Sequence, residues 1–134
     1  MDLLARREHS QQELRRKLGS RFDTHALDEA IAQLAEENLQ SDARFAHSYA
    51  RERMLRGYGP LRIAHDLRQR GVADDLIDVA VEAVPAEEGV AWIEVATTAL
   101  KRRFGEVPAT TLEEKARRIR YLRYRGFTEM PAGL

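Results

Sequence analysis

The chain has 134 residues, and its 22 Lys and Arg balance 22 Asp and Glu, so the formal net charge is zero. This length fits one compact domain or a short array of repeats. The absence of cysteine excludes disulfide bonds and thiolate chemistry. Apolar runs such as Val90–Ile93 are too short to span a membrane, and the residues near Met1 lack the apolar core of a signal peptide. We therefore expect a cytoplasmic protein.

Ala, Leu, Glu and Arg dominate the composition, and no run alternates like a β-strand, which predicts an all-α protein. Ser10 and Glu13 form a capping box that opens a short basic helix with Leu14 and Leu18 on its apolar side. Only a few residues precede this helix, so the helix before it is predicted to be short. An acidic helix is predicted to follow over residues 24–37.

Residues 42–71 are predicted to form two helices that meet at the turn Arg56–Pro60. Gly57 can adopt the left-handed conformation that ends the first helix, and Pro60 suits the first turn of the second. The two helices carry seven arginines and three acidic residues, so we expect them to pack on one side and to present positive charge on the other. An acidic helix is predicted over residues 74–84, and Pro85 is predicted to end it.

A third group begins with a predicted helix over residues 86–104, followed by a connector that contains Pro108. A capping box at Thr111 opens a basic helix over residues 111–125. The remaining residues contain Pro131 and are too few for a full acidic helix, so we expect a truncated or disordered end.

The net charge of zero hides an alternation along the chain. Residues 1–22 carry six Lys or Arg against three acids, residues 41–72 carry seven against three, and residues 101–125 carry nine against three. The segments between them, 23–40 and 73–100, carry five and seven acids with no Lys or Arg. The surface is therefore expected to be patterned rather than neutral.

The three basic helices align when Leu18, Leu67 and Leu122 are superimposed, because a cap, an apolar stripe, a basic face and a stop fall at matching places. This periodicity predicts three tandem three-helix repeats, over residues 1–40, 41–85 and 86–134. Units of this size cannot bury their apolar faces alone, so we expect them to stack into an elongated, curved array whose terminal repeats can be incomplete.

The sequence contains no pattern typical of a catalytic, metal-binding or phosphate-binding site. The four histidines lack metal-ligand spacing, no glycine-rich phosphate loop is present, and adjacent acids such as Asp74 and Asp75 are explained by their place at a helix start. Ser10 and Thr111 are better explained as helix caps than as nucleophiles. We therefore expect no enzyme activity, no metal and no cofactor.

The arginines offer the remaining candidates. On a helical wheel, one side of the third basic helix gathers Arg117, Arg118, Tyr121, Tyr124 and Arg125. Arginine beside exposed tyrosine suits recognition of phosphate or of an acidic protein surface. The alternative is that the tyrosine rings pack on a neighbouring helix while the arginines solvate the surface.

Two residues of the second repeat are ambiguous. Arg53 falls inside an apolar arc, where it either extends its charge to solvent or pairs with a carboxylate of an adjacent helix. Tyr58 is either a surface anchor or a lid on the core.

Several segments of the chain resemble the RecX family of bacterial regulators of the RecA recombinase: Ser10–Leu18, Asp42–Tyr49, Arg56–Ile63 with Asp66-Leu67 and Arg70-Gly71, Lys115–Arg118 and Tyr124–Phe127. The most specific is RGYGPLRI followed by a short helix that ends in Arg-Gly. This chain departs from the family pattern at its two ends, which are shorter than usual. It also departs at Phe22, which follows Arg21 without the intervening glycine seen at Gly71 and Gly126.

The resemblance implies three tandem three-helix repeats and a protein without catalytic activity. It implies binding along the groove of the RecA–DNA filament, with inhibition of strand exchange, ATP hydrolysis and co-protease activity, in the regulation of DNA repair. We expect a monomer that makes no membrane contact. The alternative is a protein that binds single- or double-stranded DNA directly, without RecA. The candidate partner-binding residues are Arg44, Arg51, Arg56, Tyr58, Arg62, Arg68, Arg117, Arg118, Tyr121, Tyr124 and Arg125.

Overall fold

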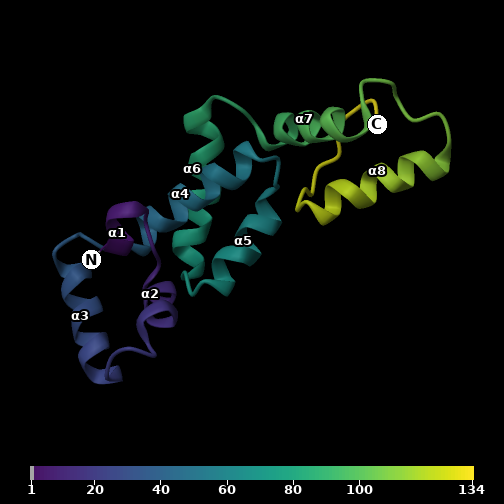
Figure 1. The fold of residues 1–134 in the computed structure, drawn as a ribbon. Coiled ribbons are helices and arrows are strands. Elements are labelled where there is room, and N and C mark those ends of the chain that lie inside the picture. The colour runs from purple at the N-terminus through teal and green to yellow at the C-terminus, as the bar shows by residue number, and fades with distance from the viewer. Residues whose placement is uncertain (1) are drawn as a thin grey trace.

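The computed structural model describes residues 2–134, and within that range it contains eight helices and no strand. The helices are α1 (Asp2–Arg6), α2 (Gln11–Leu18), α3 (Thr24–Glu36), α4 (Asp42–Leu55), α5 (Pro60–Gln69), α6 (Asp74–Glu88), α7 (Trp92–Phe104) and α8 (Leu112–Tyr124). They form an elongated array in which α1–α3 lie at one end, α4–α6 in the middle and α7–α8 at the other end (Figure 1). The predicted all-α repeat arrangement is confirmed. Every helix in the described range is too short or too polar to cross a lipid bilayer.

Each group of helices has its own small core. The aligned leucines Leu18, Leu67 and Leu122 are 9%, 0% and 0% exposed, which confirms the apolar stripe that defined the repeats. Trp92 and Val95 at the start of α7 pack against both the second and the third core. The second and third repeats are therefore joined by apolar contacts.

The prediction that Pro85 ends its helix is wrong, because α6 continues to Glu88 and ends at Gly89. A proline inside a helix removes the N–H that would bond to the carbonyl four residues earlier. Here that carbonyl, Val81 O, accepts a hydrogen bond of 3.2 Å from the indole Nε1 of Trp92. The helix can therefore continue through Pro85, and the opening helix of the third repeat begins at Trp92 rather than at residue 86.

The segment after α8 is not helical but is packed against its own repeat. Met130 and Leu134 pack against the third core, and Leu134 O accepts a hydrogen bond of 2.8 Å from the backbone N–H of Ala109. This return of the chain covers the connector between α7 and α8.

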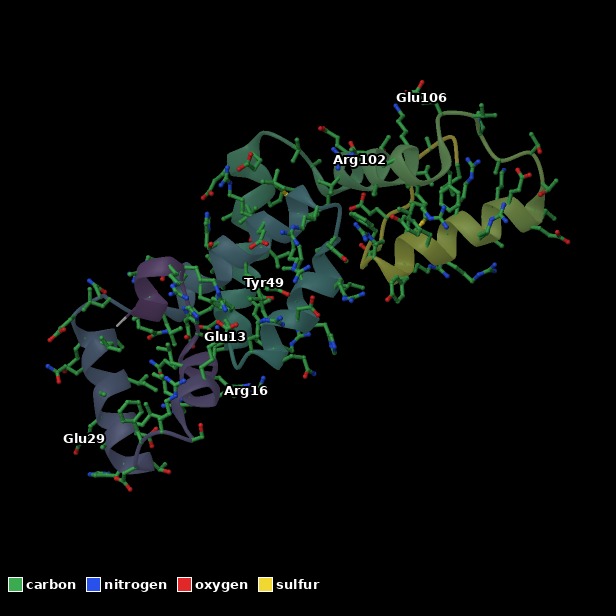
Figure 2. The ribbon with its side chains drawn as sticks, in the orientation of Figure 1. Glu13, Arg16, Glu29, Tyr49, Arg102 and Glu106 are labelled. Carbon is green, nitrogen blue, oxygen red and sulfur yellow. The ribbon has the colours of Figure 1, made fainter. Side chains whose placement is uncertain are left out.

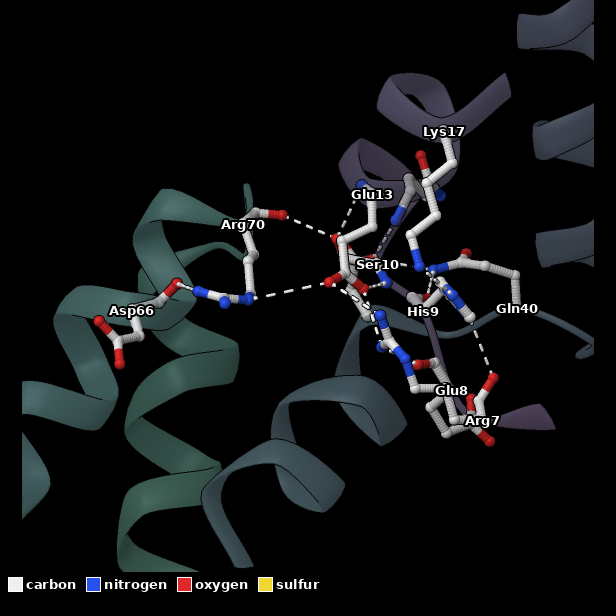
Figure 3. Close-up of polar contacts among 11 residues, drawn as sticks. Arg7, Glu8, His9, Ser10, Glu13, Lys17, Gln40, Asp66 and Arg70 are labelled. Atoms are coloured by element: carbon white, nitrogen blue, oxygen red, sulfur yellow. Dashed lines mark hydrogen bonds and ion pairs between the residues drawn. The ribbon is translucent and has the colours of Figure 1, made fainter. Parts of the chain in front are cut away.

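The first and second repeats meet at a polar contact, which we call the first joint. It consists of Ser10 and Gln12 at the start of α2 against Gln69–Gly71 at the end of α5. Figure 3 shows the part of this contact formed by Ser10 and Arg70. Ser10 Oγ donates to Arg70 O over 2.8 Å, and Gln12 Nε2 donates to Gln69 O over 2.9 Å. No apolar side chain of the described residues belongs to both the first and the second core.

His9 lies buried next to this joint, with 2% of its surface exposed (Figure 3). Its Nδ1 lies 3.1 Å from Arg7 O, and its Nε2 lies 3.1 Å from the ammonium of Lys17. This geometry requires a neutral ring that donates from Nδ1 and accepts at Nε2. Burial, together with the charges of Arg7 and Lys17, lowers the pKa of His9 below its ordinary value despite the opposing hydrogen bond to Arg7 O and the charge of Glu13.

The first repeat is therefore expected to lose stability in acid. Because the pKa of His9 is lower in the folded chain than in the unfolded chain, unfolding takes up a proton as the pH falls below about 6.5. We expect the melting temperature of the wild type to fall more steeply than that of His9→Gln between about pH 7 and pH 5. Equal slopes for the wild type and His9→Gln would contradict this role of His9.

The second and third repeats meet at the second joint, where the start of α5 contacts the end of α8. Gly59 N donates to Arg125 O over 2.7 Å, and Leu61 N donates to Gly126 O over 3.0 Å. In both joints, the start of the basic helix of one repeat contacts the end of the basic helix of the next repeat: α2 contacts α5, and α5 contacts α8.

Candidate partner-binding surface

Charged side chains cover the array along its whole length (Figure 2). In the second repeat, all five candidate arginines already have acidic partners within the chain. Arg44 pairs with Glu8, Arg51 with Glu88, Arg56 with Glu52, Arg62 with Asp66 and Arg68 with Asp74. Exposed pairs of this kind contribute little stability, about 0–1 kcal/mol each, so a partner can replace them. Their charge is nevertheless largely balanced in the free protein.

The third repeat carries positive charge that is not balanced in this way. All ten ion pairs of residues 2–134 lie between Arg7 and Glu88. Residues 101–125 contain nine Lys and Arg and three acids, and none of these nine cations lies in an ion pair within the described chain. This region is therefore the main free source of positive charge.

Arg117, Arg120 and Tyr124 form the centre of this surface, which we call the α8 face. The three residues are spaced by three and four positions, so they lie on one side of α8, and all three are exposed. Arg120 was not among the predicted candidates, although the same spacing could have indicated it.

Tyr124 is 71% exposed, which is unusual for a large aromatic residue. The guanidinium of Arg62, from α5 of the second repeat, lies 5.2 Å from the centre of its ring. Arg62 Nη1 also donates to Tyr124 O over 3.3 Å. The α8 face therefore continues across the second joint onto the second repeat.

Arg118 does not share this face, so the prediction that it lies beside Arg117 on an exposed surface is wrong. It is 9% exposed, and its Nη1 donates to Val107 O over 2.9 Å and to Leu134 O over 2.6 Å. Its guanidinium lies 5.2 Å from the centre of the Phe104 ring. Arg118 therefore ties the α7–α8 connector and the returning chain to α8.

The alignment of the repeats carried a signal for this burial. Arg118 lies four residues before Leu122, as Leu14 lies before Leu18 and Ile63 before Leu67, and both apolar counterparts are 0% exposed. A helical wheel of α8 alone ignores this register.

Arg125 is also used inside the chain. Its Nε donates to Gly57 O over 3.2 Å and its Nη2 to Arg56 O over 2.6 Å. Its guanidinium lies 3.8 Å from the centre of the Tyr58 ring. Tyr58 packs on the second core beneath this arginine, which favours the lid among its two predicted roles.

Two further predicted side chains are occupied by packing. Tyr121 is half-buried and meets Phe104 edge to face, with ring centres 5.5 Å apart. Arg53 lies over the rings of Tyr49 and Tyr58, at 5.2 Å and 5.5 Å, and takes part in no ion pair of the described residues. Its positive charge is therefore accommodated by aromatic faces rather than by a carboxylate.

Residues 2–134 contain no group of three or more His, Asp or Glu side chains that could hold a metal ion. The fold and this surface define an all-α helical-repeat protein in which the positively charged side chains without an acidic partner lie mainly in the third repeat.

Comparison with known proteins identifies the family. Residues 1–34 match the first three-helix domain of RecX, and residues 41–81 match the second. The chain is 43% identical over 127 residues to the regulatory protein RecX of Halorhodospira halophila, covering 94% of this chain and 76% of that protein. It is 43% identical over 128 residues to the regulatory protein RecX of Pseudomonas putida, covering 95% and 80%. The chain belongs to the RecX family of regulatory proteins.

A solved structure supports the fold. RecX from Lactobacillus salivarius superimposes with a TM-score of 0.75 at 22% sequence identity, covering 95% of this chain and 82% of that one. The division into repeats at residues 40 and 85 stays a prediction, because the two family domains end at residues 34 and 81.

Proposed function

We propose that this chain binds the RecA–DNA filament and inhibits the recombinase, ATPase and co-protease activities of RecA, as a cytoplasmic regulator of DNA repair and recombination that is not itself an enzyme. Membership of a family of regulatory proteins named RecX supports a regulatory role. The observation that carries the proposal is the unpaired positive charge of the third repeat at one end of an elongated array. Such a surface suits an acidic protein groove and the phosphates of the DNA that the groove encloses.

Reversing charge on the α8 face is expected to weaken inhibition without weakening the fold. In Arg117→Glu/Arg120→Glu, two exposed cations become anions, so attraction to an acidic partner turns into repulsion. We expect the concentration that half-inhibits RecA ATPase on single-stranded DNA to rise about tenfold or more, which corresponds to about 1.4 kcal/mol of binding free energy. The melting temperature should stay within a few degrees of the wild type.

A matched control is Arg16→Glu/Arg21→Glu, which changes the net charge equally on exposed positions of the first repeat. It should affect inhibition less than the α8 variant. Equal losses would show that only total charge matters, and full inhibition by the α8 variant would exclude this face. If the wild type leaves RecA ATPase unchanged, the proposed function itself is wrong.

One observation favours direct binding to nucleic acid as a second candidate. The exposed ring of Tyr124, held under Arg62, is a platform on which an unpaired base can stack. Tight binding to bare single-stranded DNA, with an affinity that falls steeply as salt rises, would favour this candidate over recognition of RecA.

A further inference from the structure

The two joints use the same positions of the repeat with different chemistry. In the first joint, the N–H of Ser10 is occupied by Glu13 Oε1 of its capping box, so the Ser10 hydroxyl donates to Arg70 O. In the second joint, Gly59 has no side chain to cap the helix, and its free N–H donates to Arg125 O. The acceptor is thus the carbonyl of the arginine in an Arg-Gly pair at both places. The arginine carbonyl accepts a hydrogen bond from the start of the neighbouring basic helix in both joints, although the donor atom differs. This indicates that the relative position of the two helices, rather than the identity of the donor, is common to the joints.

The glycine of each Arg-Gly pair lets the two helices approach closely. A Cβ on Gly126 would lie 2.4 Å from Arg62 N, and a Cβ on Gly71 would lie 2.8 Å from Gln12 Cβ. Both distances are too short for any side chain. At the second joint the backbone of α5 lies directly against Gly126, and at the first joint the side chain of Gln12 lies against Gly71. Both contacts restrict sliding of one repeat on the next.

Arg125 adds a second restraint, at the second joint. It belongs to the third repeat, but its polar and aromatic partners at Arg56, Gly57 and Tyr58 are consecutive residues of the α4–α5 turn in the second repeat. Two donors directed at two carbonyls, with the flat guanidinium on a ring, fix direction as well as distance. No carboxylate of the described chain pairs with Arg125, so its role at the joint does not rest on an ion pair.

We propose that Arg125 is a positioning residue: it fixes the orientation of α8 relative to α5, so that the α8 face and Arg62 are presented to the partner as one surface. This inference rests on the proposed function, because a filament of identical protomers offers binding positions at fixed spacing. A surface already held in its binding geometry loses less conformational entropy on association. Loosening the joint should therefore weaken inhibition although no exposed charge is lost.

The test compares Arg125→Lys with Arg123→Lys. Each keeps one positive charge, but Arg123 is exposed on α8 and lies outside the joint contacts. Because the chain has no cysteine, cysteines introduced at exposed Val79 on α6 and exposed Leu112 on α8 can carry a unique pair of spin labels. Pulsed electron paramagnetic resonance then reports the distribution of distances between the second and third repeats.

We expect one narrow distance distribution in the wild type and in Arg123→Lys, and a broader one in Arg125→Lys at unchanged helical content by circular dichroism. The half-inhibiting concentration for RecA ATPase should rise about threefold to tenfold in Arg125→Lys alone, about 0.7–1.4 kcal/mol. Tyr58→Leu removes the ring under the guanidinium but keeps apolar volume, and it should broaden the distance distribution similarly. It can replace Arg125→Lys in the test if that variant is too unstable to purify.

An unchanged distance distribution in both joint variants would overturn the proposal. Broadened distances with wild-type inhibition would also overturn it, because orientation would then not matter for the partner. The distance measurement contains no RecA, so it tests the joint even if the proposed function fails.

Discussion

Replacing Arg118 with glutamate is expected to destabilise the third repeat by about 3–5 kcal/mol. The guanidinium donates to Val107 O and Leu134 O, and it is 9% exposed. A glutamate at this position cannot donate, and its carboxylate would lie near two carbonyl oxygens in a site with little access to water. The free energy of unfolding, measured by urea denaturation, should fall accordingly.

The neighbouring residue provides the control. Arg117→Glu makes the same chemical change one position earlier, on an exposed side chain, and should alter stability by no more than about 0.5 kcal/mol. The two variants should therefore separate stability from inhibition, since Arg117 contributes to the α8 face and Arg118 to packing. A urea midpoint of Arg118→Glu equal to that of Arg117→Glu would contradict the buried role.

The arrangement of helices in this protein follows from local features of the sequence. Capping residues such as Ser10 and Thr111 accept hydrogen bonds from the N–H groups three positions later, as their sequence context predicted. The stripe that contains Leu18, Leu67 and Leu122 is buried because apolar spacing along one helix determines which side can leave water. Interactions within about one turn of helix were sufficient for these predictions.

The errors arise where a residue's partner is distant in sequence. Pro85 does not end α6 because Trp92, in the next repeat, supplies the donor that satisfies Val81 O. Arg118 is buried because the α7–α8 connector and the chain after α8 both return to it. Neither partner can be identified from the periodicity of a single helix.

The Arg-Gly pairs show the same limitation. In the sequence, Arg70-Gly71 and Arg125-Gly126 are explained as helix ends, and in the structure they do end α5 and α8. Their second role, as the acceptor surface for the preceding repeat, depends on contacts between residues about 60 positions apart. The candidate surface was predicted in outline from its arginines, but which of them are free could not be determined before the joints were known.

Replacing Gly126 with alanine is expected to open the second joint. Gly126 has φ +100°, a conformation that costs an L-residue about 1–3 kcal/mol. The added Cβ would also lie 2.4 Å from Arg62 N, a contact that backbone movement must relieve at a further cost of about 1–3 kcal/mol. We expect a large loss in the free energy of unfolding and a loss of RecA inhibition.

Gly89→Ala separates the two contributions, because Gly89 has the left-handed φ of +70° but nothing lies within 4 Å of the position of its Cβ. It should therefore show the conformational cost alone, whereas Gly126→Ala should show that cost and the displacement of α5. The spin-label distance between α6 and α8 distinguishes them further, because it should broaden only for Gly126→Ala. If the two variants lose equal stability and keep equal distances, the close approach at Gly126 does not hold the repeats together, and the orientation of α8 would then depend on Arg125 and on the apolar contacts of Trp92 and Val95.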